Sequence, residues 1–239
     1  MKAVILAAGL GTRMRPLTFT KPKFLLPVGG KPALDHVVSL LKRAGVNKIA
    51  MVVGFGKEQI IGRYGKGKNF GVDVAYLEQK ELLGTANAVQ LAERFVNGER
   101  FVVVNGDTLI DQESLNAFVA RYKKLSGEKN FSCLMGTIEV EDPGQFGIVF
   151  TKGEKVTSIV EKPKRVKSRL ANAGVYIFDS KIFDAIKRTK KSPRGEYELT
   201  SSMQMMIDEG GDVYTSPLEL WTDIGRPWDL LIANEYFLR

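Results

Sequence analysis

The chain has 239 residues, of which 44% are hydrophobic, and it carries a formal net charge of +8 with one cysteine and one histidine. This content can bury one substantial core, and no apolar run approaches the roughly 18 residues that a transmembrane helix needs. The lone cysteine excludes an intramolecular disulfide, and the lone histidine argues against a zinc cluster or a Ser/His triad. Sparse cysteine indicates a reducing compartment, and the apolar N-terminal stretch is too short for a signal peptide, so we expect a cytoplasmic protein.

The positive charge suits either a nucleic-acid surface or anionic small substrates. Basic residues are spread along the chain, and the densest group, at 162–169, lies in a segment typical of a solvated loop. No alternation of aromatic and basic residues resembles an RNA-binding platform. We therefore expect small anionic substrates, with no nucleic-acid and no membrane partner.

Strand-like and helix-like patterns alternate through the first half of the chain. Continuous apolar runs predict buried strands, and apolar residues at helical spacing predict helices. The strands are expected at residues 3–7, 49–53, 72–77 and 101–104, and the helices at 34–41, 85–95 and 115–122.

The second half is less regular. Strands are expected at residues 131–140, 146–150, 156–161 and 172–178, and helices at 181–188, 199–207 and 227–238. No internal repeat or linker is evident. The pattern predicts a single α/β domain over residues 1–239, a Rossmann-like three-layer sandwich with a mixed, mostly parallel central sheet.

The first predicted strand leads into a loop with two glycines, Gly9 and Gly11, that let backbone amides approach an anion closely. Arg13 and Lys23 flank this loop and could neutralise phosphate oxygens. A dinucleotide fingerprint is excluded because Met14 stands where its third glycine should be, and the Gly-Lys-Ser/Thr of a P-loop is absent. Taken alone, the loop is equally compatible with an ordinary glycine-rich turn.

Asp107 comes just after the predicted strand at 101–104, where open α/β sheets place their ligand crevice. Carboxylate oxygens suit Mg²⁺, which commonly bridges protein carboxylates and substrate phosphates. The alternative is a turn aspartate that caps the following helix.

The segment Gly-Leu-Gly-Thr-Arg-Met-Arg-Pro-Leu-Thr (9–18), followed by Lys-Pro-Lys (21–23), resembles the signature of sugar-1-phosphate nucleotidyltransferases. These enzymes join a nucleoside triphosphate to a sugar 1-phosphate and release pyrophosphate. A Trp-Thr-Asp-Ile-Gly segment (221–225) is similar to a second family element, and the resemblance implies that Asp107 and Asp223 coordinate a catalytic Mg²⁺. Only the resemblance brings these two acids together, because more than a hundred residues separate them.

The resemblance also implies the other site residues. The catalytic set would be Arg13, Lys23, Asp107, Lys162 and Asp223. The nucleotide would contact Leu6, Ala7, Ala8, Gly9, Gly11, Thr12, Arg13, Gln79, Gly84, Thr85 and Gly106. The sugar phosphate would contact Gly147, Glu161, Lys162, Asn172 and Gly174. Gln79 offers an amide donor and an acceptor that match uracil or thymine, which favours UTP or dTTP over GTP.

We therefore expect an enzyme that transfers a nucleotidyl group from UTP or dTTP to glucose-1-phosphate or N-acetylglucosamine-1-phosphate. Mannose-1-phosphate guanylyltransferase is the alternative reaction, and a non-catalytic sugar-nucleotide-binding regulatory subunit is the alternative role. Relatives often continue into a left-handed β-helix, which we expect this chain to lack. A homo-oligomer is left open.

Overall fold

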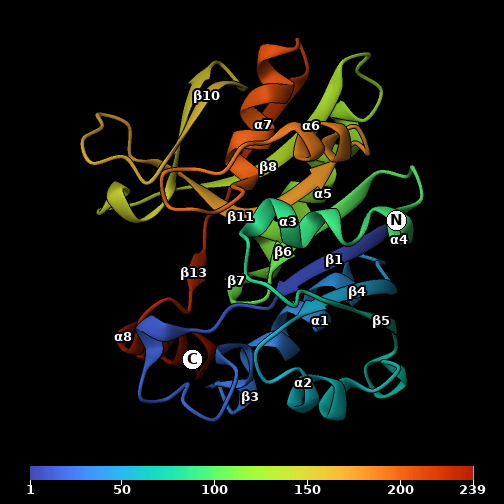
Figure 1. The fold of residues 1–239 in the computed structure, drawn as a ribbon, viewed down its shortest axis with the longest axis vertical. Coiled ribbons are helices and arrows are strands. Elements are labelled where there is room, and N and C mark those ends of the chain that lie inside the picture. Colours follow the sequence, from blue (N-terminus) through green and yellow to red (C-terminus); the bar gives the residue numbers. More distant parts are fainter. Residues whose placement is uncertain (239) are drawn as a thin grey trace.

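The apolar segments form a nine-stranded sheet in the computed structural model, which describes residues 1–238 (Figure 1). The strand order is β5-β4-β1-β6-β11-β8-β12-β10-β9. The bounds are β1 (Lys2–Ala7), β4 (Lys48–Val53), β5 (Asp73–Glu78), β6 (Phe101–Asn105), β8 (Phe131–Glu139), β9 (Gly147–Lys152), β10 (Lys155–Glu161), β11 (Leu170–Phe178) and β12 (Asp212–Pro217). Two strands of two residues each, β2 (Pro27–Val28) and β3 (Lys31–Pro32), pair with each other outside this sheet.

The sheet is mixed, and most of its strands point the same way. β1 is parallel to β4 and β6, β4 is parallel to β5, and β8 is parallel to β12. β11 runs against β6 and β8, and β10 runs against β12 and β9. The predicted fold class is therefore confirmed, with β10 and β11 as the reversed strands among the described residues.

Helices cover both faces of the sheet, which gives the three predicted layers. Their bounds are α1 (Ala33–Arg43), α2 (Lys57–Tyr64), α3 (Thr85–Gln90), α4 (Glu93–Val96), α5 (Gln112–Leu125), α6 (Ile182–Arg188), α7 (Leu199–Asp208) and α8 (Pro227–Leu238). Side chains of α1 and α5 share one core cluster with the sheet, and those of α3, α6 and α7 share another. None of the helices in residues 1–238 is long and apolar enough to cross a bilayer.

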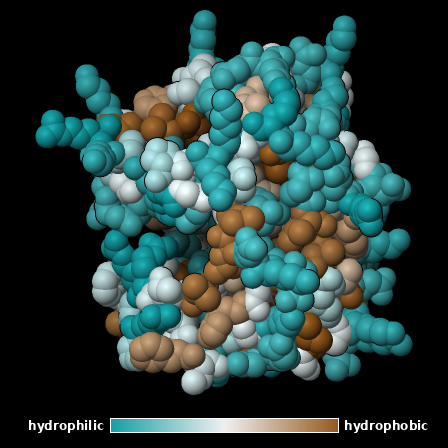
Figure 2. Space-filling model, in the orientation of Figure 1, coloured by the Kyte–Doolittle hydropathy of each residue, from teal (hydrophilic) through white to brown (hydrophobic). Residues whose placement is uncertain are grey.

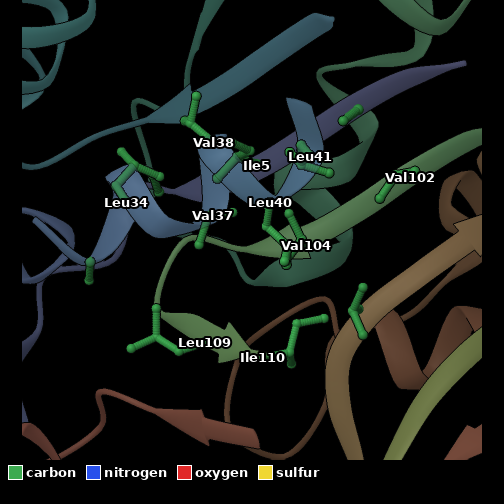
Figure 3. Packing of buried hydrophobic residues seen from close by; sticks show 14 of the residues in the cluster. Ile5, Leu34, Val37, Val38, Leu40, Leu41, Val102, Val104, Leu109 and Ile110 are labelled. Carbon is green, nitrogen blue, oxygen red and sulfur yellow. The ribbon is translucent and has the colours of Figure 1, made fainter. Parts of the chain in front are cut away.

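The α1 face of the core shows why the sequence period matters. Leu34, Val37 and Leu41 recur at helical spacing and point toward the sheet, where Ile5 and Val104 meet them (Figure 3). All five side chains are at most 4% exposed. Under this helix β1 and β6 pair in parallel, so the loops that follow both strands emerge at the same edge of the sheet.

Some elements differ from the sequence prediction. The helix expected over 85–95 is two helices, α3 and α4, with Leu91 and Ala92 between them. The helix α2 was not predicted, because only Ile60 and Tyr64 of its eight residues are buried and no clear apolar stripe results. The strand β12 was also missed, since its buried residues include Thr215 and Ser216.

Two further short strands, also not predicted, connect distant parts of the chain. β7 (Thr108–Ile110) pairs in antiparallel fashion with β13 (Trp221–Asp223), and Asp223 lies opposite Thr108. The Trp221 Nε1–H donates to the Ala173 carbonyl at 2.8 Å, and its ring packs edge-on against Phe146. This ladder holds the segment before α8 beside the end of β6.

The chain after β4 supports the glycine loop that follows β1. A Cβ on Gly54 would lie 2.7 Å from the Ala8 carbonyl oxygen, which is closer than real Cβ contacts. Gly54→Ala must therefore displace this loop, and we expect it to lower the free energy of unfolding by about 1–3 kcal/mol in urea titrations. Gly62→Ala, in α2 with open space around it, should instead raise that free energy by about 0.5–1 kcal/mol. Equal effects of the two substitutions would contradict the steric role of Gly54.

Candidate active site

A cleft of about 590 Å³ opens where β1 and β6 end, between the side of the molecule that carries β9 and β10 and the side that carries α8. Figure 2 shows the surface hollowed there. Its size is typical of a small-molecule site. Many charged and polar side chains line it, as expected for anionic or hydroxyl-rich ligands.

Most of the residues singled out from the sequence lie on this cleft. They are Leu6, Ala8, Gly9, Gly11, Thr12, Arg13, Lys23, Gln79, Gly84, Thr85, Asp107, Gly147, Glu161, Lys162, Asn172, Gly174 and Asp223. Ala7 and Gly106 are not among the lining residues. Because side chains alternate along a strand, Ala7 packs with Ile5 in the α1 core, whereas Leu6 faces the opposite layer. Gly106 lies under Phe24, whose ring would be 3.0 Å from a Cβ added there.

The two predicted metal-binding acids are neighbours. Asp107 follows β6 and is 7% exposed, and Asp223 ends β13. The Ile224 amide donates to the Asp107 carbonyl at 3.3 Å, which ties the two segments together. Burial, and then the charge of Asp107, raise the pKa of Asp223 to about 6, and the nearby Lys23 ammonium opposes this shift.

Lys23 forms an ion pair with Asp107 through its Nζ. A cation therefore already stands against the acid pair, which would otherwise repel itself. Two carboxylates are a hard-oxygen donor set that fits Mg²⁺, since this ion often takes one or two carboxylates and completes its shell with waters and phosphate oxygens. No group of three or more His, Cys, Asp or Glu arranged for a metal occurs in residues 1–238.

The glycine loop has the geometry of an anion cradle. Gly11 adopts a φ of 63°, and a Cβ there would lie 3.1 Å from the Cβ of Lys23, so glycine allows both the turn and the close approach of Lys23. Thr18 Oγ1 and the Met14 amide both donate to the Gly11 carbonyl, at 2.7 and 2.9 Å. No hydrogen bond described within residues 1–238 uses the amides of Gly9 or Gly11 as donors, so these groups can meet phosphate oxygens.

Gln79 lies on the opposite part of the cleft and is 6% exposed. Its Nε2 donates to the Gly84 carbonyl at 3.1 Å and to Asn87 Oδ1 at 2.9 Å. Both amide hydrogens are thus used within the protein, and only the Gln79 carbonyl is left for a ligand. This changes the expectation from sequence, in which the amide offered a donor as well as an acceptor.

The residues expected to bind the sugar phosphate form the far side of the cleft. Lys162 has a φ of 42°, which is unusual for a residue other than glycine, and its backbone amide donates to the Phe146 carbonyl at 3.0 Å. Asn172 accepts from the Gly174 amide at 3.0 Å and donates to the Tyr176 hydroxyl at 2.6 Å. These bonds shape an irregularity in β11 that turns Asn172 and Gly174 toward the cleft.

Sequence reasoning missed a charged group next to Glu161. Arg194 lies 3.7 Å from Glu161, 3.3 Å from Glu196 and 3.2 Å from Glu198. Glu198 is 4% exposed, and burial together with the charge of Glu161 raises its pKa. The segment Arg-Gly-Glu-Tyr-Glu (194–198) carried a signal, but a glutamate just before a helix also fits a simple cap.

A mostly parallel sheet covered by helices, with a glycine loop and an acid pair where its strands end, is the arrangement of an α/β protein that binds phosphorylated ligands. The sequence profile of the nucleotidyl transferase family matches residues 2–239. The chain belongs to this family.

Several curated proteins are similar over the whole of this chain. The low-salt glycan biosynthesis nucleotidyltransferase Agl11 of Haloferax volcanii is 38% identical, and the bifunctional protein GlmU of Methanocaldococcus jannaschii is 40% identical. A glucose-1-phosphate thymidylyltransferase of Streptomyces antibioticus is 35% identical. The chain spans 66%, 54% and 66% of the lengths of these three relatives.

Solved structures agree with the fold. A Bacillus anthracis protein assigned as a glucose-1-phosphate thymidylyltransferase superposes with a TM-score of 0.90 at 33% identity, covering 100% of this chain and 95% of the other. A UDP-glucose pyrophosphorylase superposes with a TM-score of 0.86 at 24% identity, covering 99% and 97%, which supports the fold alone.

The raised pKa of Asp223 gives a testable pH dependence. In metal-free protein the fold disfavours the ionised form of Asp223 and favours its protonated form. The stability that the protonated carboxyl contributes is present below about pH 4 and is lost as pH rises through about 6. We expect Asp223→Asn in EDTA to be more stable than wild type at pH 8 by on the order of 1–3 kcal/mol, and to match it near pH 4. Urea titrations at the two pH values measure this difference.

The exposed Asp73 is the matched control, because Asp73→Asn should show no gain that depends on pH. Added Mg²⁺ should stabilise wild type and not Asp223→Asn. A constant difference between Asp223→Asn and wild type at both pH values would contradict the assignment of the raised pKa to this carboxyl.

Proposed function

We propose that this chain transfers a nucleotidyl group from UTP or dTTP to a sugar 1-phosphate, either glucose-1-phosphate or N-acetylglucosamine-1-phosphate. The products are a nucleotide-sugar and pyrophosphate. The observation that carries the proposal is that Asp107 and Asp223 lie together in one cleft with the glycine loop. Lys23 lies between this acid pair and the loop. A protein that only binds a sugar nucleotide does not require this acid pair.

In the proposed reaction, a phosphate oxygen of the sugar 1-phosphate attacks the α-phosphorus of the nucleotide in line, and pyrophosphate leaves. The attacking phosphate is already ionised at neutral pH, so the chain need not supply a nucleophile. Its contribution is positioning and charge stabilisation: the loop amides and Arg13 hold the triphosphate, and Lys162 holds the sugar phosphate. Lys23 neutralises developing charge. Mg²⁺ held by Asp107 and Asp223 would supply further positive charge at the α-phosphate.

The nucleotide preference rests on Gln79 and on the named relatives. A fixed carbonyl accepts a hydrogen bond from a ring N–H, which uracil, thymine and guanine have and which cytosine and adenine lack. The Streptomyces antibioticus relative is named a thymidylyltransferase, which supports dTTP over GTP. We also propose a cytoplasmic location, because the single cysteine, Cys133, is buried and unpaired.

A grid of nucleoside triphosphates against sugar 1-phosphates, read by pyrophosphate release with Mg²⁺, tests the proposed substrates. UTP and dTTP with glucose-1-phosphate or N-acetylglucosamine-1-phosphate should give the highest kcat/KM. CTP and ATP should be at least about tenfold poorer, because neither base has a ring N–H to donate to the Gln79 carbonyl. Preference for GTP with mannose-1-phosphate would instead assign the chain as a guanylyltransferase, and no release with any pair would favour the regulatory role.

Asp107→Asn tests the acid pair directly. The substitution removes a carboxylate charge while keeping the side-chain shape, so turnover should fall by at least about a hundredfold while circular dichroism stays unchanged. Asp184→Asn, on the exposed surface of α6, is the control and should keep wild-type turnover. Wild-type turnover by Asp107→Asn would remove this residue from the mechanism.

A further inference from the structure

Glu161, at the end of β10, is held on one of its two carboxylate oxygens by a side chain from α7. The Thr200 hydroxyl donates to Glu161 Oε2 at 2.9 Å, and Thr200 is 6% exposed. The other oxygen, Oε1, lies 3.7 Å from Arg194 Nη1 at the cleft. The two oxygens of this carboxylate therefore have different surroundings: Oε2 accepts a hydrogen bond from a buried threonine, and Oε1 lies near the guanidinium of Arg194, which also lines the cleft.

The helix that carries Thr200 is itself fixed against β10. Gln204 lies one turn after Thr200 on α7, and its Oε1 accepts from the Ile159 amide at 2.8 Å. At the start of α7, the Leu199 amide donates to Thr85 Oγ1 at 3.0 Å. Thr200 thus has little freedom to move, because contacts on both sides of it hold the helix in place.

Gly147 closes the remaining space around this pair. A Cβ built on Gly147 would lie 3.0 Å from Thr200 Cγ2 and 3.1 Å from Glu161 Oε2. The threonine methyl and the carboxylate therefore pack directly on the backbone of β9. Rotation of the carboxylate away from the Thr200 hydroxyl is restricted on this side.

We propose that Thr200 is a positioning residue for the sugar. By holding Oε2 of Glu161, it presents Oε1 to a hydroxyl group of the sugar ring in one orientation. A carboxylate oxygen fixed in this way favours sugars that carry a hydroxyl at the position it meets over deoxy analogues that lack it. This inference rests on the proposed function, because it assumes that a sugar 1-phosphate occupies this part of the cleft.

Thr200→Val removes the hydroxyl and keeps the shape and the methyl that packs on Gly147. We expect KM for the sugar 1-phosphate to rise about tenfold to a hundredfold, with KM for the nucleotide unchanged, and we expect Thr200→Ser to restore the wild-type value. KM does not depend on the amount of folded enzyme, so a partial loss of folding leaves the test valid. Thr215→Val, the same change at a buried threonine of β12 away from the cleft, should leave both KM values unaltered.

A cycle with Glu161→Ala separates positioning from a general structural role. If Thr200 acts through Glu161, adding Thr200→Val to Glu161→Ala should cause no further rise in KM for the sugar phosphate. If the KM for one deoxy sugar 1-phosphate is unchanged by Glu161→Ala, that KM should also be unchanged by Thr200→Val.

Active wild-type enzyme with an unchanged KM in Thr200→Val, or with additive losses in the double variant, would overturn the inference and leave the proposed function standing. Wild type that is inactive with every sugar 1-phosphate would instead overturn the proposed function itself.

Discussion

The antiparallel pairing of β7 with β13 is the constraint on which the site depends. It places Asp223 opposite Thr108, the residue after Asp107, although more than a hundred residues separate the two acids in the chain. Leu109 and Ile110 anchor β7 in the core, and the Trp221 indole holds β13 by its bond to the Ala173 carbonyl. The two neighbouring carboxylates repel each other and Lys23 offsets only part of this repulsion, so these apolar and hydrogen-bonded anchors help to hold the acid pair together.

A second set of bonds joins the base side of the cleft to the sugar side. The Tyr197 amide donates to the Leu83 carbonyl at 2.7 Å, and the Ala86 amide donates to the Tyr197 carbonyl at 2.9 Å. The segment between Gln79 and α3 is therefore tied to the segment that leads into α7. Because the proposed chemistry relies on placing two bound phosphates in line, a rigid link between the two walls of the cleft serves the reaction directly.

Much of this arrangement could be read from the sequence, and the exceptions have physical reasons. The buried strands β1, β4 and β6 have unbroken apolar runs, and the glycine loop has an unusual composition, so local pattern identified both. The meeting of Asp107 and Asp223 is a long-range contact through three-residue strands, which no local period reveals. Similarly, the use of both Gln79 amide hydrogens depends on Asn87 and Gly84 in the folded chain. The side chain of Ala7 packs in the core beside Ile5 and does not line the cleft, because a strand alternates its faces and a motif carried over as a continuous run ignores this alternation.

The central claim is that Asp107 and Asp223 converge to hold one divalent cation beside the triphosphate loop. Anomalous diffraction from crystals grown with Mn²⁺ and a nucleoside triphosphate would test it most directly, since Mn²⁺ takes the same hard oxygen ligands as Mg²⁺. We expect an anomalous peak coordinated by both carboxylates, with nucleotide phosphate oxygens completing its shell. A peak bound to neither acid, or a triphosphate bound away from residues 9–13, would contradict the claim.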